Sequence, residues 1–196
     1  MTKIYTAIGL MSGTSCDGID ASIIQSDGEE QLKILFNDYI AFDINTIESI
    51  KKIREKINKS KDLKLNIEQI NKLEEDVTFL HAKSVKQIID KAKIKYSEID
   101  VIGFHGQTIF HSAEEKISRQ IGSGELLNKL TGLDVVYNFR ENDIKNGGQG
   151  APLTPIYHEL IQRKLKTNLP VVFLNIGGIA NITYINKQKK IYGYDS

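Results

Sequence analysis

The segment from Ile8 to Asp20 combines residue types that can hold a phosphate group. Gly13 and Gly18 allow backbone N–H groups to approach a ligand closely, and consecutive N–H groups in such a turn form an anion-binding concavity. Hydroxyl donors are added by Ser12, Thr14 and Ser15. The segment therefore predicts a site for a phosphorylated ligand, with ATP as the first candidate. A plain hairpin, in which glycine and serine serve only the turn, is the alternative.

Two carboxylates and the only cysteine of the chain lie in the same segment. The segment is not a Walker-type loop, because Gly-Lys-Ser/Thr is missing and a strand rather than a helix is expected to follow. Asp17 and Asp20 offer the hard oxygen ligands that Mg²⁺ prefers, directly or through water, and the choice between them stays open. Cys16 is expected to fill space rather than to act as a nucleophile, because no histidine neighbours it in sequence.

Hydrophobic patterning predicts the elements that must position this turn. Helical spacing covers Ile44–Ile57, opened by Asp43 or Asn45 as the cap, and the longer segment Ile67–Lys95, which contains His81 as an ordinary amphipathic position. Three short apolar runs with tight connections predict an antiparallel meander, with strands at Ile4–Met11, Ile19–Gln25 and Leu32–Phe42.

In the middle of the chain a buried strand, Asp100–Phe104, is expected to end at the sequence His-Gly-Gln-Thr. Strand ends are where α/β folds tend to place ligands, which makes these polar residues candidates for a site. Further along we expect a helix at Leu126–Leu130, a strand at Asp134–Phe139, a glycine-rich loop at Asn142–Gly150 and a helix at Leu153–Leu165 that begins near Pro152 and contains His158 as another amphipathic position.

A strand that runs to a glycine turn and back occurs twice, at residues 6–24 and at residues 170–185. Such an echo predicts a duplicated domain rather than a solenoid, whose units are much shorter. We therefore expect a first domain at residues 1–168 and an incomplete second domain at residues 169–196. The second copy would stop after its opening hairpin, without helices to cover its sheet, and the chain would be a fragment.

Composition narrows the class of protein. The chain has 196 residues, a hydrophobic fraction of 40% and a charged fraction of 26%, which is typical of a globular protein. A net charge of +1 with dispersed lysines gives no case for nucleic acid. One cysteine rules out an internal disulfide, and no apolar stretch reaches the length of a signal peptide core or a membrane span. We expect a cytoplasmic protein with no membrane partner.

The chain resembles the anhydro-N-acetylmuramic acid kinase family in six stretches that follow the family's order. They are Gly9–Asp20 (GLMSGTSCDGID), Phe104–His111 (FHGQTIFH), Gln120–Leu127 (QIGSGELL), Asn138–Pro155 (NFRENDIKNGGQGAPLTP), Leu174–Ile185 (LNIGGIANITYI) and Gly193–Ser196 (GYDS). The resemblance implies an α/β, actin-like ATPase (ribonuclease H-like) fold with a mixed sheet. It also implies an ATP- and Mg²⁺-dependent kinase that converts 1,6-anhydro-N-acetylmuramate to N-acetylmuramate 6-phosphate, with hydrolytic opening of the anhydro ring, in peptidoglycan recycling.

Carried over residue by residue, the resemblance assigns roles to named positions. Asp195 falls on the family's proposed general base, although without the family it would be expected to be a solvated residue near a chain end. Asn175, Gly177, Gly178 and Asn181 would lie near the phosphates, or form a structural hairpin. The ATP phosphates would be held by Gly13, Thr14, Ser15, Cys16, Asp17, Gly18, Ile19 and Asp20.

The sugar substrate would be bound by a second set of residues. Arg140 suits the lactyl carboxylate, which a planar guanidinium can bind with two hydrogen bonds, and a surface salt bridge is the alternative. Asp143 could bind sugar hydroxyls or orient its own loop. His105 is favoured for sugar contact or positioning over catalysis. The complete set is His105, Gln107, Thr108, Arg140 and Asp143.

Two other classes of function compete with the enzyme. The family's members are about twice as long as this chain, so a truncated remnant that binds sugar or phosphate weakly is one alternative. A different actin-like ATPase that acts as a nucleotide switch is the other, and the sugar-type motifs argue against it. A homodimer is left open.

Overall fold

The computed structural model describes residues 2–177 and 180–195, with the backbone only at residue 195. It contains two compact units, Met1–Phe139 and Arg140–Ser196, and each is described here by itself. The compact units divide earlier than the domain boundary predicted between residues 168 and 169, which stays a prediction. Within the described ranges, no helix is both long and apolar enough to cross a membrane.

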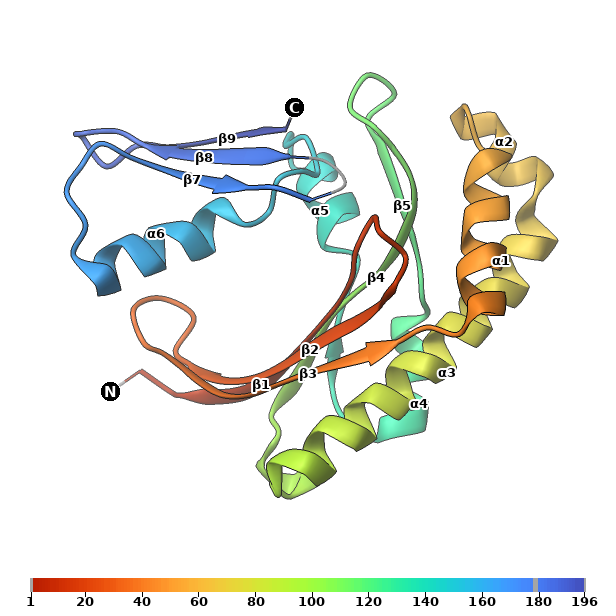
Figure 1. Ribbon diagram of the computed structural model, residues 1–196, viewed down its shortest axis with the longest axis horizontal. Coiled ribbons are helices and arrows are strands. Elements are labelled where there is room, and N and C mark those ends of the chain that lie inside the picture. Colours follow the sequence, from red (N-terminus) through yellow and green to blue (C-terminus); the bar gives the residue numbers. More distant parts are fainter. Residues whose placement is uncertain (1, 178–179, 196) are drawn as a thin grey trace. The chain divides into compact units, whose positions relative to one another are not determined.

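A mixed sheet forms the centre of the first unit (Figure 1). The strand order is β3-β2-β1-β4-β5, and β6 pairs with β4. The pairs β1–β2, β2–β3 and β4–β5 are antiparallel, whereas β4 lies parallel to β1 and to β6. The strands are β1 (Tyr5–Ser12), β2 (Gly18–Ser26), β3 (Leu32–Ala41), β4 (Val101–Ser112), β5 (Ile117–Ile121) and β6 (Val135–Val136). The predicted meander and the mixed sheet are confirmed.

The meander forms because its apolar residues alternate along the strands. Ile8 pairs with Ile23, and Leu10 pairs with Ala21, so that all four side chains lie on one face of the sheet and are buried. Residues that alternate with them, such as Gly9 and Asp20, lie on the opposite face and are exposed. The register therefore gives the sheet one face for the core and one open face.

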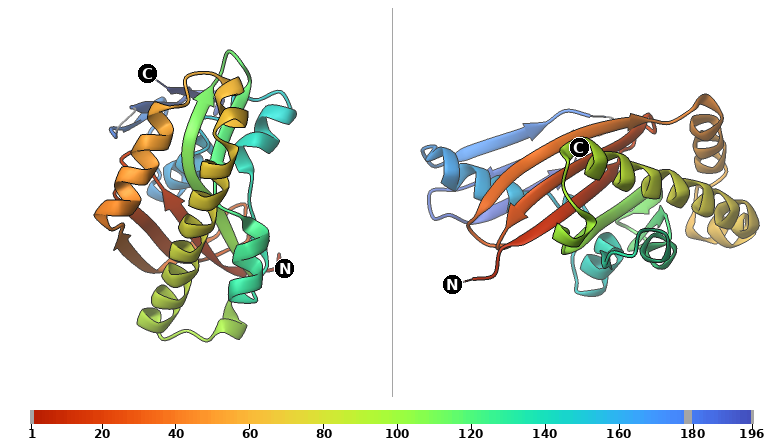
Figure 2. Two further views of the ribbon diagram at one scale, coloured as in Figure 1. Left: turned by 90° about the vertical axis from the view of Figure 1, so that its right-hand side faces the viewer. Right: turned by 90° about the horizontal axis from the view of Figure 1, so that it is seen from below.

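Helices cover the apolar face of the sheet, and α3 lies along it (Figure 2). Asp43 caps α1 by accepting a hydrogen bond from the Thr46 N–H at 2.8 Å, which decides between the two predicted caps. Ser123 caps α4 in the same way through the N–H of Leu126. The helices are α1 (Ile44–Glu55), α2 (Ser60–Leu65), α3 (Ile67–Ala92), the 3₁₀ turn η1 (Tyr96–Glu98) and α4 (Gly124–Thr131).

Strand β4 corrects the prediction that a strand ends before the sequence His-Gly-Gln-Thr. The strand continues through these residues to Ser112, because it exchanges β1 for the antiparallel partner β5. Gly106 lies at this exchange with a φ of +72°, and a Cβ there would lie 2.5 Å from the carbonyl oxygen of Ile121. Strand β5 contains the polar sequence Ser-Arg-Gln and therefore lacks the apolar alternation by which a strand is predicted from sequence.

In the second unit, the helix α6 (Pro155–Leu165) packs on an antiparallel sheet of β7 (Val171–Asn175), β8 (Asn181–Ile185) and β9 (Ile191–Asp195). His158 Nδ1 lies 2.7 Å from Thr183 Oγ1, and the His158 ring stacks on Phe173 with centroids 4.9 Å apart. The expectation that no helix covers this sheet is therefore wrong. The sheet also has a third strand, and its interpretation as a second copy of the first domain stays a prediction.

Two element boundaries between Val135 and Pro155, around the point where the first unit ends and the second begins, differ from the sequence-based expectation. The helix α5 (Phe139–Lys145) occupies residues expected to finish a strand and to open a glycine-rich loop. Only Val135 and Val136 form the strand, because this short segment pairs with β4 at two positions. Helix α6 begins at Pro155 rather than at Pro152, since Pro155 occupies the first turn, where a missing N–H costs nothing.

Candidate functional site

The turn between β1 and β2 forms a tight, ordered structure. The N–H of Cys16 donates to the Gly13 carbonyl at 3.1 Å, and Cys16 adopts a φ of +57°. The Cys16 side chain is fully buried, and its thiol faces the carbonyl oxygen of Thr14 at 3.4 Å. This burial agrees with the expectation that Cys16 fills space. Protein atoms therefore fill the space on the inner side of the turn.

Gln107 from β4 holds the turn from one side. Its Nε2 donates to the Gly13 carbonyl at 2.9 Å, and its Oε1 lies 2.6 Å from Ser12 Oγ. The hydroxyl of Ser12 also lies 3.0 Å from the carbonyl oxygen of Gly18, at the other end of the turn. Gln107 is fully buried, so it links β1, β2 and β4 at the base of the turn.

Arg54 from α1 holds the turn from a second side. Its Nη1 donates to the Thr14 carbonyl at 2.8 Å and contacts Cys16 Sγ at 3.2 Å. The sequence alone indicates no role for Arg54. The available signal was the rarity of arginine, four in the chain, but this signal does not say which arginine reaches the turn. The contact joins residues 40 positions apart, and only the packing of α1 brings them together.

These two anchors orient the N–H groups of the turn. A trans peptide places its C=O and N–H on opposite sides, so fixing the carbonyls of Gly13 and Thr14 turns the N–H groups of Thr14 and Ser15 away from the anchors. Among the described residues, neither N–H group has a hydrogen-bond acceptor. Two adjacent N–H groups held in this way can bind an anionic oxygen.

Two carboxylates and a phenol lie beside the turn. The Ser15 hydroxyl donates to Asp17 Oδ1 at 2.5 Å, and this hydrogen bond is the main reason why the pKa of Asp17 is lowered. Partial desolvation and the negative charge of Asp17 raise the pKa of Asp20. The pKa of Tyr39 is also raised, by desolvation and by both carboxylates. A cation beside this pair would relieve the repulsion between them.

The carboxylate pair fits a magnesium ion only in part. The described residues contain no group of three or more His, Cys, Asp or Glu side chains that could enclose a metal. Mg²⁺ is commonly held by one or two carboxylates, with phosphate oxygens and water as its other ligands. Asp17 and Asp20 match that smaller requirement.

The structure gives a reason for glycine at position 18 that the sequence did not reveal. A Cβ at this position would lie 2.4 Å from the Ile40 carbonyl oxygen and 2.7 Å from the Tyr39 hydroxyl. The glycine is therefore required by the close approach of β3. At Gly13, in contrast, the nearest atom to an added Cβ is Ser15 Oγ at 3.5 Å, which is an ordinary contact.

The remaining candidates on β4 make local contacts. His105 is half-buried, and its Nδ1 lies 2.7 Å from the Gly106 carbonyl oxygen. Thr108 Oγ1 accepts a hydrogen bond from Gln120 Nε2 at 3.2 Å. Of the three predicted residues His105, Gln107 and Thr108, the structure shows only Gln107 hydrogen-bonded to the turn. Sugar contact by any of them stays a prediction.

Arg140 and Asp143 both hold the same glycine in the second unit. Arg140 Nη1 donates to the Gly150 carbonyl at 2.7 Å, and the Gly150 N–H donates to Asp143 Oδ2 at 2.8 Å. A Cβ at Gly148 would collide with the Asp143 carboxylate, and Gly150 has a φ of +77°. The two side chains thus shape residues 146–150, which is the loop-orienting role weighed for Asp143. Their predicted contacts with a sugar acid are not tested by this geometry.

The proposed base lies at the end of β9, and its side chain lies outside the described residues. The backbone register places Asn175, Asn181 and Asp195 opposite one another across the three strands. The Asn181 Oδ1 is buried and has no hydrogen-bond partner among the described atoms. Of the two glycines assigned to this hairpin, Gly178 also lies outside the described residues.

The mixed sheet and its covering helices place the protein in the α/β class. The family model of anhydro-N-acetylmuramic acid kinase matches residues 5–196, and the chain belongs to this family. The family membership that the six motifs predicted is thereby confirmed.

Similar proteins agree with the family. The chain is 55% identical over 185 residues to an anhydro-N-acetylmuramic acid kinase of Pelagibacter ubique (strain HTCC1062), covering 94% of this chain and 48% of the relative. It is 41% identical to that of Agrobacterium fabrum (strain C58 / ATCC 33970), covering 100% of this chain and 53% of the relative. The chain thus spans about half the length of the curated relatives it matches.

A likeness among solved structures concerns the fold alone. The reductive activator for corrinoid,iron-sulfur protein is similar with a TM-score of 0.50 and 14% sequence identity, covering 98% of this chain and 30% of that chain.

Proposed function

We propose that this chain is the phosphate-binding portion of a kinase that transfers the γ-phosphate of ATP to 1,6-anhydro-N-acetylmuramate. The observation that supports this proposal is the β1–β2 turn, whose Thr14 and Ser15 N–H groups are held away from their anchors without acceptors among the described residues. The family match agrees with this ligand class. An actin-like arrangement of two related domains is the architecture that we propose for the whole protein.

The turn and its anchors would act mainly by positioning. Phosphoryl transfer requires in-line placement of the reacting groups and neutralisation of charge more than covalent chemistry by the protein. The N–H groups of Thr14 and Ser15 would hold phosphate oxygens, while Gln107 and Arg54 keep both donors in place. Asp17 and Asp20 would hold Mg²⁺, which when bound neutralises phosphate charge.

Asp195 is proposed as the general base. Its carboxylate would take a proton from the water that attacks C1, the bridge bond from C1 to O6 would break, and O6 would bond to the γ-phosphorus as ADP leaves. The products are N-acetylmuramate 6-phosphate and ADP, a reaction suited to peptidoglycan recycling. The support is the match of Gly193–Ser196 to the family motif.

The sugar acid would be held by His105, Thr108, Arg140 and Asp143. Arg140 Nη1 donates to the Gly150 carbonyl, and a planar guanidinium is the side chain that can bind a carboxylate with two hydrogen bonds.

Activity is best tested on this chain joined to the remaining half of the Pelagibacter ubique relative, with ATP, Mg²⁺ and the anhydro sugar. We expect the joined protein to form the 6-phosphate and to lose this activity on Asp195→Asn. Asp76→Asn is the matched control, because Asp76 is exposed on α3 and lies outside the proposed site. An inactive joined protein that folds and binds ATP would contradict the proposed reaction.

The half-length match favours one second candidate. The 196 residues alone would bind phosphate or sugar weakly without catalysis, because an ATP site must bury most of its ligand. Calorimetry with ATP on the 196-residue chain separates this candidate from a catalytic one. Weak binding without turnover is the result that supports it, and turnover by the 196-residue chain contradicts it.

A further inference from the structure

The β1–β2 turn has no cation of its own to balance the negative charge of a phosphate. The segment Ile8–Asp20 contains no lysine or arginine, and it contains the two carboxylates Asp17 and Asp20. In a Walker-type loop, a lysine of the loop itself reaches the phosphates. A turn that binds phosphate without such a lysine must rely on a metal ion or on a cation from another part of the chain.

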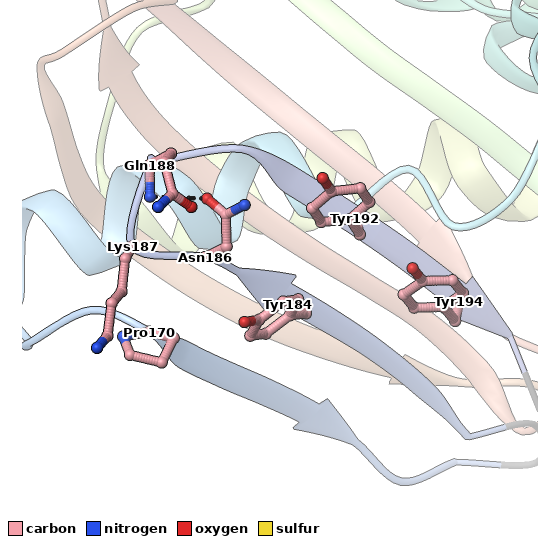
Figure 3. Close-up of a pocket in the computed structure, with 7 residues that line it drawn as sticks. All are labelled: Pro170, Tyr184, Asn186, Lys187, Gln188, Tyr192 and Tyr194. Carbon is pink, nitrogen blue, oxygen red and sulfur yellow. Dashed lines mark hydrogen bonds between the residues drawn. The ribbon is translucent and has the colours of Figure 1, made fainter.

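A hollow in the second unit offers little of the chemistry that phosphate binding needs (Figure 3). Its volume is about 340 Å³, and Tyr184, Tyr192 and Tyr194 line it together with Lys187. The Tyr184 and Tyr192 rings stack with centroids 6.1 Å apart. The described residues that line it include a single basic side chain and no glycine. The hollow therefore gives no support for a second phosphate site.

Arg54 brings a positive charge to the β1–β2 turn. Its Nη1 donates to the Thr14 carbonyl at 2.8 Å and to Cys16 Sγ at 3.2 Å. In the described part of the chain no carboxylate forms an ion pair with Arg54, whereas Arg119 of the same unit pairs with Glu74 at 2.9 Å. The charge of Arg54 is therefore not neutralised within the unit.

Packing fixes the Arg54 guanidinium against the turn. Ile50 and Ile53 are buried in the core and hold α1 in place, and Arg54 follows them in the last turn of that helix. On the other side of the contact, Cys16 is fully buried. Its thiol also lies 3.4 Å from the Thr14 carbonyl oxygen, so this carbonyl is held from two directions. The contact between α1 and the turn is therefore part of the packed structure.

The charge of Arg54 acts on the turn through one peptide bond. The Thr14 C=O and the Ser15 N–H belong to the same trans peptide unit and point in opposite directions. A cationic donor at the carbonyl polarises the peptide and makes its N–H a stronger donor, because successive hydrogen bonds polarise one another. The Ser15 N–H has no acceptor among the described residues. It is therefore the group through which the charge of Arg54 reaches a bound anion.

We propose that Arg54 strengthens phosphate binding at the β1–β2 turn by polarising the Thr14–Ser15 peptide, without touching the ligand. Arg54 is then a positioning residue that also supplies the cation missing from the turn. This inference rests on the proposed function, since it takes a phosphate oxygen as the ligand of the Ser15 N–H. A purely mechanical anchor would need only a hydrogen-bond donor at position 54, whereas the proposed role needs a positive charge.

The test titrates the isotope-labelled 196-residue chain with inorganic triphosphate and Mg²⁺, because this probe contains only the charged part of ATP. Binding is followed by NMR through the amide resonances of Thr14 and Ser15, which we expect to shift in the unchanged chain. Arg54→Gln keeps a hydrogen-bond donor but loses the charge, and it should weaken binding by about tenfold. Arg54→Lys keeps the charge but loses the planar fork, and it should weaken binding by at most about threefold.

Lys52→Gln is the matched control, because it removes the same charge from the same helix. Lys52 is exposed and pairs with Glu48, and it lies two positions before Arg54, so it projects from another side of α1. This control should bind triphosphate like the unchanged chain. The amide resonances of β1, β2 and β4 confirm that each variant is folded before affinities are compared.

Three results would overturn the inference while leaving the proposed function in place. They are an Arg54→Gln chain that binds as well as the unchanged chain, equal losses for Arg54→Gln and Arg54→Lys, and equal losses for Arg54→Gln and Lys52→Gln. The second result would show that the shape of the anchor matters rather than its charge. If the Thr14 and Ser15 resonances of the unchanged chain do not respond to triphosphate, the phosphate site of the proposed function is wrong, and this inference is wrong with it.

Discussion

His81 makes the stability of the first unit depend on pH in a calculable way. The side chain is fully buried on α3, where its Nδ1–H donates to the Val77 carbonyl at 2.7 Å. Its ring meets Phe104 edge-on at 4.8 Å, and its Nε2 has no partner among the described atoms. Burial lowers the pKa of His81 from 6.5 to about 4, and the charge of His105 adds to the effect. The sequence pattern treated this residue as an ordinary helix position.

The direction in which pH changes the stability follows from the pKa of His81 in the unfolded and in the folded chain. Below pH 6.5 the unfolded chain binds a proton at His81, whereas the folded chain does so only near pH 4, so stability is lost as the pH falls through this window. At 1.36 kcal/mol per pH unit, the difference is worth about 3 kcal/mol in total, of which about 2 kcal/mol is lost between about pH 7.5 and about pH 5. Carboxylates with lowered pKa values, such as Asp17 and Asp38, titrate below this range.

The assay is urea denaturation followed by far-UV circular dichroism at several pH values, on the unchanged chain and on His81→Leu. Leucine is close in volume and removes the buried Nε2, so we expect it to fold and to lose most of the fall in unfolding free energy between about pH 7.5 and about pH 5. His158→Gln is the comparison, because burial also lowers the pKa of His158 in the second unit. If the unchanged chain and His81→Leu lose stability in parallel, the reasoning about His81 is refuted.

Three further predictions concern the candidate site. Gln107→Leu should lower the free energy of unfolding by about 1–3 kcal/mol in urea denaturation and weaken ATP binding in calorimetry, because Ser12 Oγ and the Gly13 carbonyl each lose one of their two hydrogen-bond partners; unchanged ATP affinity would contradict the role of the anchor. Gly18→Ala should cost about 1–3 kcal/mol through its collision with β3, whereas Gly13→Ala should be milder; equal thermal shifts would contradict the geometry. Asp143→Ala should speed proteolysis at residues 146–150, because the Gly150 N–H loses its acceptor, and Glu141→Ala is the matched exposed control; equal cleavage rates would contradict the prediction.

Local patterns were sufficient for much of the first unit. The meander and both long helices follow from apolar periodicity, and all are present. Capping chemistry offered Asp43 or Asn45 as the cap of α1, and only the structure chose Asp43. The strand β5 and the continuation of β4 could not be read in this way. Their pairing is decided by an exchange of partner at Gly106, which joins segments without an apolar alternation of their own.

The second unit shows a different limit. Helical spacing predicted α6 except for its start, but it did not show what the helix covers, since a helix and a sheet with apolar faces can pack in several ways. Arg140 and Asp143 were expected on a loop, and they lie on α5 because Phe139–Lys145 forms a short helix before the glycines begin. Their shared hold on Gly150 depends on that helix.

The sequence by itself determined the family and the residues of the β1–β2 turn, because motif order and turn chemistry are local properties of the chain. Only the tertiary structure decided how that turn is held. Gln107 reaches it from 94 residues away and Arg54 from 40, and the close approach of β3 explains Gly18. Such contacts depend on how strands and helices pack, and packing joins residues whose distance along the chain gives no sign that they meet.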